Sequence, residues 1–174
     1  MRLLLINLPR TGSTTLHTRL VEEYGGLGIF NPFDGTDRTK IIGRDKIVVK
    51  SGILYPEGLS YEGRVLFYVD LIKDFDKVIL LSRRNNKAHL ESWLHMRKHN
   101  KFTRELFNSQ SNYTFNPDEY SDKDYRIGQK ELDEWNNILT QISELTDTPI
   151  TYYEDIFDEN SQDRYRRENI KSLI

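Results

Sequence analysis

The chain has 174 residues, of which 30% are charged and 37% hydrophobic, and its formal net charge is −2. That length suits one domain with a sizeable core, so we expect a single domain over residues 1–174. The small negative charge argues against a general nucleic-acid-binding protein. No apolar stretch has the length of a membrane span, and the apolar N-terminal segment lacks the pattern of a signal peptide. Because the chain has no cysteine, disulfides and thiolate chemistry are excluded, and we expect a cytoplasmic protein.

Short apolar runs and segments with helical periodicity alternate along the chain. The runs predict strands at residues 3–7, 27–30, 46–50, 77–81 and 149–153. The periodic segments predict helices at residues 14–24, 65–74, 86–99, 125–146 and 160–174. Residues 100–124 are polar and aromatic, and we interpret them as a flexible loop or insertion over an active site. The alternation predicts an α/β fold of three layers, with a central, mostly parallel sheet flanked by helices.

Polar and charged residues follow every confidently predicted strand. In a parallel sheet the carboxyl ends of the strands meet at one edge, and ligands bind there. The strand ends in question are residues 7–15, 50–52, 82–84 and 153–155. We therefore expect these four segments to contribute to one shared site.

The first strand end has the chemistry of an anion-binding loop. Pro9 to Thr15 connect an apolar strand to a helix, so backbone N–H groups and a helix N-terminus converge on one point. Arg10 adds a planar positive charge. The loop has one glycine and no lysine, so it is not a Walker A sequence, and ATP hydrolysis with magnesium is not indicated. The pattern favours a bound phosphate of another kind of ligand.

Pro9-Arg10-Thr11-Gly12-Ser13-Thr14 resembles the 5′-phosphosulfate-binding loop of sulfotransferases that use 3′-phosphoadenosine-5′-phosphosulfate (PAPS). The resemblance implies the P-loop-like sulfotransferase fold. It also implies that the 5′-phosphosulfate is bound by the loop and the start of the helix, namely by Arg10, Thr11, Gly12, Ser13, Thr14 and Thr15.

Two later segments extend the resemblance. Arg84 and Ser92 match the family's 3′-phosphate motif, in which a serine follows a strand-end arginine by eight positions. Arg83 is expected to be either a structural neighbour of Arg84 or an alternative phosphate contact. Tyr152-Tyr153-Glu154-Asp155-Ile156 resembles the Tyr-Glu-Asp-Leu segment after a late strand, which implies that Tyr153 lies near the adenine. Glu154 and Asp155 are expected to be structural or to cap a helix.

The general base is where the chain departs from the family. Lys50 matches the lysine of the Lys-Thr-His strand end in cytosolic sulfotransferases, but Gly52 stands where those enzymes carry the basic histidine. Asn31 stands where carbohydrate and bacterial members carry a glutamate, and an amide cannot take a proton at neutral pH. Asp34 is the first substitute candidate and His17 the second.

The predicted function is transfer of a sulfuryl group from PAPS to a hydroxyl of a small molecule or a glycan, with release of 3′-phosphoadenosine 5′-phosphate. Arg10 and Lys50 are expected to stabilise the leaving phosphate, and no metal is expected. Two alternatives stay open: a catalytically impaired module that binds the same nucleotides, and, less favoured, a small-molecule kinase of the P-loop class. The acceptor and the oligomeric state are not predicted.

Overall fold

The strands form a single sheet in which every neighbouring pair is parallel. The structure is a computed structural model that describes residues 1–33, 37–54, 58–99, 115–157 and 167–173. Across the sheet the order is β2-β3-β1-β4-β5. The strands are β1 Arg2–Asn7, β2 Leu27–Phe30, β3 Ile47–Gly52, β4 Lys77–Ser82 and β5 Ile150–Tyr152. The predicted α/β class is confirmed, with a sheet that is parallel throughout.

The described residues group into two compact units. The first contains residues 1–84 and 135–174, and therefore the whole sheet; the second contains residues 85–134. The helix α4 Asp122–Thr146 starts in the second unit and ends in the first. The prediction of one domain over the whole chain stays a prediction.

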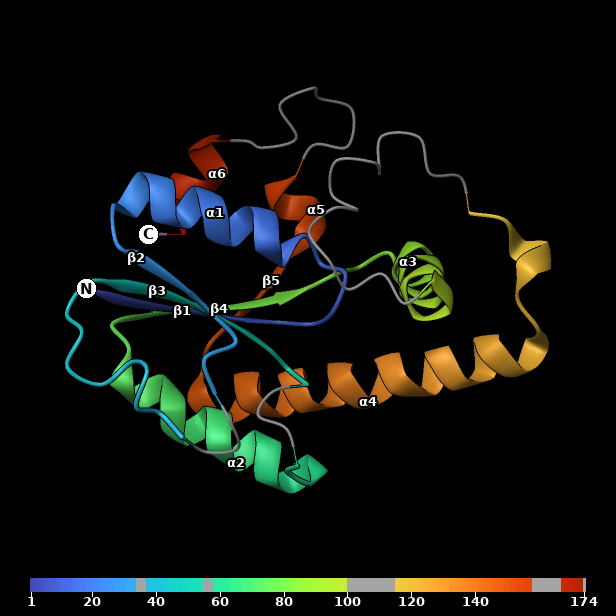
Figure 1. Ribbon diagram of the computed structural model, residues 1–174, viewed down its shortest axis with the longest axis horizontal. Coiled ribbons are helices and arrows are strands. Elements are labelled where there is room, and N and C mark those ends of the chain that lie inside the picture. Colours follow the sequence, from blue (N-terminus) through green and yellow to red (C-terminus); the bar gives the residue numbers. More distant parts are fainter. Residues whose placement is uncertain (34–36, 55–57, 100–114, 158–166, 174) are drawn as a thin grey trace. The chain divides into compact units, whose positions relative to one another are not determined.

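Helices cover both faces of the sheet in the first unit (Figure 1). On one face lie α1 Ser13–Tyr24, α5 Tyr153–Ile156 and α6 Arg167–Ser172. On the other lie α2 Tyr61–Leu71, which a 3₁₀ turn η1 extends over Ile72–Asp74, and the part of α4 from Trp135 onward. The sheet is thus the middle layer of three, as its continuously apolar central strands require.

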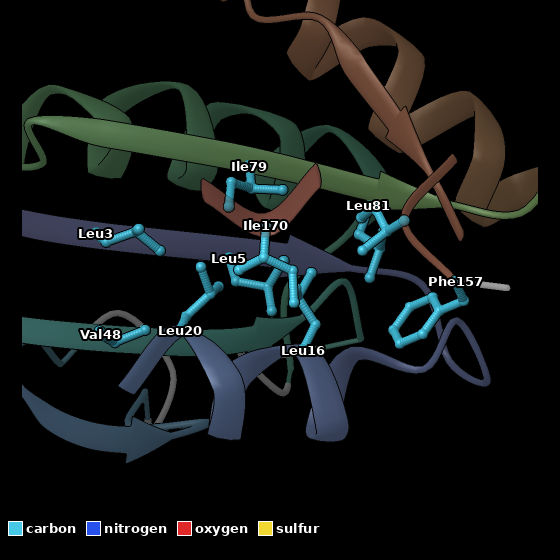
Figure 2. Packing of buried hydrophobic residues seen from close by; sticks show 10 residues of the cluster. Leu3, Leu5, Leu16, Leu20, Val48, Ile79, Leu81, Phe157 and Ile170 are labelled. Atoms are coloured by element: carbon cyan, nitrogen blue, oxygen red, sulfur yellow. The ribbon is translucent and has the colours of Figure 1, made fainter. Parts of the chain in front are cut away.

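The side chains of β1 are buried on both faces of the sheet. Side chains alternate along a strand, so Leu3 and Leu5 point to the α1 face while Leu4 and Ile6 point to the other, and all four are fully buried. Figure 2 shows Leu16 and Leu20 of α1 packed against Leu3 and Leu5. Val48, Ile79, Leu81, Ile156, Phe157 and Ile170 complete the cluster. This packing fixes α1, and with it the loop that precedes it.

A buried hydroxyl network holds α2 to the end of β3. Tyr68 is fully buried, and its hydroxyl donates to the carbonyl of Gly52 at 2.8 Å and lies 2.7 Å from Oγ of Ser51. Burial of the phenol raises the pKa of Tyr68. Because three buried polar groups satisfy one another here, the carboxyl end of β3 has a fixed position next to that of β1.

The second unit contains α3 Asn86–His99, the 3₁₀ turn η4 Pro117–Glu119 and the first part of α4. Glu131 of α4 accepts hydrogen bonds from Nε1 of Trp93 at 2.8 Å and from Arg97 at 2.9 Å. Gly128 lets the helices approach, because a Cβ there would lie 2.9 Å from side-chain carbons of Leu90 and Leu94. Among the described helices, none is both long enough and apolar enough to cross a membrane.

Several predicted boundaries were wrong. The second helix begins at Tyr61 instead of residue 65, because Ser60 caps it by accepting from the backbone N–H of Gly63 at 3.1 Å. The strand predicted through residue 153 ends at Tyr152, and Tyr153 starts the short helix α5. Residues 100–114 and 158–166 lie outside the described residues. Most of the predicted insertion and the first part of the predicted C-terminal helix therefore cannot be compared with the structure.

Candidate anion-binding site

The strand order creates a branch point between β1 and β4. After β1 the chain passes through α1 on one face and returns in β2, on one side of β1. After β4 it returns to β5 on the other side, through the part of α4 that lies on the opposite face. Where neighbouring strands send their connections to opposite faces, a crevice opens at their carboxyl ends, and α/β proteins bind ligands in it. The loops after β1 and β4 lie at this branch point.

The loop after β1 has an unusual backbone. Arg10 and Gly12 both adopt left-handed conformations, with φ of 62° and 67°. The left-handed region costs an ordinary side chain about 1–2 kcal/mol, which makes Arg10 a strained position. Thr11 is fully buried and donates its hydroxyl to the carbonyl of Leu8 at 2.8 Å, which closes the turn. The first backbone N–H groups of α1, starting at Ser13, have no carbonyl partner within the helix and are available to an anion.

Tyr153 forms a wall against this loop. A Cβ added at Gly12 would lie 2.7 Å from Cε2 and 2.9 Å from Cδ2 of Tyr153. The ring stacks on Phe157, with centroids 4.3 Å apart. Gly12 is therefore required twice, by its positive φ and by the close approach of the ring. The resemblance placed Tyr153 near an adenine; the structure shows it against the loop, and the adenine contact stays a prediction.

Lys50 enters the site from β3. Its ammonium donates to Oγ1 of Thr14, in the first turn of α1, at 3.3 Å and lies 5.5 Å from the centre of the Phe30 ring. Burial of the ammonium lowers the pKa of Lys50 to about 8. A buried positive charge is costly unless an opposite charge accompanies it. The position of Lys50, beside the free N-terminus of α1, thus favours binding of an anion.

Two arginines add positive charge at the branch point. The pKa of Arg10 is lowered, first by burial and then by repulsion from the guanidinium of Arg83. Arg83 leaves the end of β4 with its guanidinium 4.9 Å above the Tyr153 ring, so both Arg83 and Gly12 contact the same ring. Nε of Arg83 lies 3.7 Å from a carboxylate oxygen of Glu154. Arg83, for which the sequence predicted at most an alternative phosphate contact, thus borders the loop after β1.

Arg84 points to a different set of partners. Its two terminal nitrogens hold the two carboxylate oxygens of Asp155, one at 2.8 Å and the other in a still shorter contact. Its guanidinium lies 4.3 Å from the centre of the Tyr152 ring, and its backbone N–H donates to Glu154 at 2.9 Å. The hydrogen bonds that Arg84 donates to Asp155 raise the pKa of Arg84. Ser92 lies on α3 in the second unit, so the predicted Arg84–Ser92 phosphate clamp stays a prediction.

The base candidates occupy less favourable places. His17 is buried between α1 and the sheet, its Nε2–H donates to the carbonyl of Val48 at 2.9 Å, and its ring lies 4.2 Å from that of Phe30. Burial lowers the pKa of His17. Nδ1 therefore carries the lone pair, and it is buried without a hydrogen-bond partner among the described residues. Asp34 lies outside the described residues.

Asn31 links two strand ends beside the candidate site. It adopts a left-handed conformation with φ of 39°, which asparagine tolerates better than most residues. Its side-chain oxygen accepts from the backbone N–H of Gly52 at 2.9 Å, and its own N–H donates to the carbonyl of Lys50 at 2.7 Å. Asn31 thus ties the carboxyl ends of β2 and β3 together and supports the backbone that presents Lys50.

Comparison with known proteins adds no assignment, because neither a family model nor a curated protein matches this chain. The sequence predicted a structural or capping role for Glu154 and Asp155, but not that they pair with Arg83 and Arg84. The paired pattern of Arg83-Arg84 after one strand and Glu154-Asp155 after its neighbour was the available signal, since adjacent parallel strand ends lie side by side.

We expect Gly12→Ala to destabilise the protein, because the new methyl group adds left-handed strain of about 1–2 kcal/mol and overlaps Tyr153. Gly43→Ala is the matched control, since Gly43 has nearly the same φ, 70°, and nothing within 4 Å of its added Cβ. Urea denaturation of both variants separates the two effects. Equal losses of unfolding free energy would show that the Tyr153 contact has no consequence.

Proposed function

We propose that this chain is a PAPS-dependent sulfotransferase that moves a sulfuryl group to a hydroxyl of a small molecule or glycan. The observation that carries the proposal is the approach of Lys50 to Thr14 at the start of α1, beside a loop in which Arg10 and Gly12 are left-handed. Such a loop, a free helix N-terminus and a buried ammonium together suit the 5′-phosphosulfate of the donor.

In the proposed reaction the acceptor oxygen attacks sulfur, and the bond from sulfur to the bridging oxygen of the 5′-phosphate breaks. Negative charge grows on the leaving phosphate as that bond lengthens, so cations fixed beside it stabilise the transition state more than the ground state. Lys50 and Arg10 are the proposed cations, and the hydroxyls of Thr14 and Thr15 and the N–H groups of the loop hold the oxygens. The acceptor proton goes to a base, for which Asp34 and the buried His17 remain the candidates.

At the other end of the nucleotide, Arg84 and Ser92 are proposed to bind the 3′-phosphate. A guanidinium suits this task because its planar fork donates two parallel hydrogen bonds to one phosphate. The exposed position of Arg84, with 54% of its side chain accessible, is compatible with a ligand contact.

A second candidate is a module that binds the nucleotide without catalysing transfer. Two observations favour it: Asn31 and Gly52 stand at the two positions where sulfotransferases carry a basic glutamate and a basic histidine, and the backbone N–H of Gly52 donates to the side-chain oxygen of Asn31. The described part of the site thus offers neither of these two bases.

Calorimetric titration with 3′-phosphoadenosine 5′-phosphate tests the binding proposal. Lys50→Met should weaken binding by about 1.5–3 kcal/mol, roughly 10- to 100-fold, because a charged contact to phosphate is lost. The same variant should raise the melting temperature of the free protein, since a buried ammonium no longer has to be accommodated. Lys46→Met, at the exposed amino end of the same strand, is the matched control and should change neither quantity. Absence of binding to the wild-type protein would remove the proposal.

Binding should also depend on pH through Lys50. In the free protein its pKa is about 8, below the ordinary 10.5, and a neighbouring phosphate raises it again. Below pH 7 Lys50 is protonated in both states, so it adds no pH dependence there. Above pH 8 binding must take up a proton, and affinity should fall by up to about tenfold per pH unit until the pKa of the bound state is reached. Lys50→Met should flatten this limb; a limb that persists in the variant would assign it to another group.

Transfer itself is tested with PAPS carrying a radioactive sulfuryl group and a panel of alcohols, phenols and sugars. The sulfotransferase proposal predicts labelled product with at least one acceptor class, and no requirement for ATP or magnesium. Lys50→Met should reduce the rate by about 10²- to 10³-fold, the usual effect of losing one group that stabilises transition-state charge. Nucleotide binding without any labelled product over the panel would favour the binding module.

A further inference from the structure

The exits of β4 and β5 carry two parallel sets of contacts. Arg83 lies over the Tyr153 ring and near Glu154, whereas Arg84 lies over the Tyr152 ring and on Asp155. Each set contains a guanidinium, an aromatic ring and a carboxylate. The two sets lie next to each other, because β4 and β5 are hydrogen-bonded neighbours and their carboxyl ends lie side by side.

The two sets differ in exposure and in the quality of the ion pair. The side chain of Arg83 is 15% exposed, and its Nε is 3.7 Å from Glu154, which is beyond hydrogen-bond distance. Arg84 and Asp155 are 54% and 48% exposed, and the fork of Arg84 engages both carboxylate oxygens. An exposed ion pair is weak, because water solvates both partners well when they separate. The Arg84–Asp155 pair can therefore open at little cost.

We infer that Asp155 is a built-in counter-anion: in the free protein its carboxylate occupies the fork of Arg84, and a phosphate group of the ligand displaces it. This inference rests on the proposed function, in which Arg84 contacts the 3′-phosphate of the nucleotide. Carboxylate and phosphate both present two oxygens to the same pair of terminal nitrogens, so one site cannot hold both in this geometry.

The exchange needs no movement of the backbone. When Asp155 turns away, the Tyr152 ring still lies against the guanidinium of Arg84, and Glu154 still accepts from the backbone N–H of Arg84. The carbonyl of Asp155 accepts from Nδ2 of Asn169 at 2.6 Å, which fixes its main chain while the side chain rotates. Arg84 is thus kept in position for the phosphate by contacts that survive the exchange.

A consequence follows for selectivity. A ligand with a phosphate at the 3′ position can replace the carboxylate charge for charge, whereas a nucleotide with a 3′-hydroxyl cannot. Asp155 would therefore act on selectivity through Arg84: it leaves the affinity for a 3′-hydroxyl nucleotide unchanged and reduces the affinity gained from a 3′-phosphate by the cost of its own displacement.

The test is calorimetry with two probes, 3′-phosphoadenosine 5′-phosphate and adenosine 5′-phosphate. Asp155→Asn keeps the shape of the side chain and removes its charge. We expect it to bind the bisphosphate about three- to tenfold more tightly, since one like charge beside a dianion is removed. Affinity for adenosine 5′-phosphate should stay within about twofold of that of the wild-type protein, so the ratio of the two affinities rises. A purely structural role of Asp155 would not move that ratio.

Four further variants make the result specific. Asp70 of α2 pairs with Arg38, whose guanidinium lies over the Phe67 ring, so this site has the same three components as the Arg84 site. Asp70→Asn is therefore the matched control and should leave both affinities unchanged. Asp155→Glu keeps the charge and should restore the wild-type ratio. In an Arg84→Ala background, Asp155→Asn should have no effect. Asp155→Ser is the second charge-removing variant and should behave as Asp155→Asn does.

The possible outcomes separate this inference from the proposed function. If the wild-type protein binds the bisphosphate and neither charge-removing variant binds it more tightly, the counter-anion role is overturned while the proposed function stands. An equal increase in affinity for both probes would also overturn it, because the effect of Asp155 would then not depend on a contact between Arg84 and the 3′-phosphate. If the wild-type protein does not bind the bisphosphate, both proposals fall.

Discussion

Positive charge that is held partly out of water dominates the carboxyl edge of this sheet. Lys50 and Arg10 both have lowered pKa values, and burial is the first cause in each case. Arg83 adds repulsion to Arg10 instead of relieving it. Holding these charges out of water destabilises the fold. The hydrophobic packing of β1 against α1 offsets this cost, since Leu3, Leu5, Leu16 and Leu20 are fully buried.

The two sides of the branch point handle this charge differently. On the β3 side, Lys50 contacts the hydroxyl of Thr14 and the face of the Phe30 ring, both neutral groups. On the β5 side, Arg84 is paired with Asp155 and lies against the Tyr152 ring. In the proposed function, Lys50 receives an anionic group of the ligand directly, whereas Arg84 exchanges Asp155 for one. The proposed ligand, with two separated phosphate groups, suits this pair of environments.

Much of the fold followed from patterns that are local in the sequence. The apolar run of β1, the glycine pair after α1 and the polar strand ends were sufficient for the parallel sheet and for the edge that carries the site. The boundaries that failed depended on particular side chains: the cap at Ser60 lengthened α2, and the packing of Tyr153 on Phe157 accompanies a helical turn where a strand was expected. Periodicity does not report such contacts, because it averages over several residues.

The sequence by itself determined which segment forms the loop between β1 and α1 and which strand ends lie at the same edge of the sheet, since buried strands, glycine and proline act over a few neighbouring residues. Only the tertiary structure decided the state of each charge. Lys50 and Thr14 are 36 positions apart, and Arg84 and Asp155 are 71 apart. Whether a cation is buried, stacked or paired depends on the dielectric environment and partners that the folded chain brings together, and these are not encoded in the spacing of any one motif.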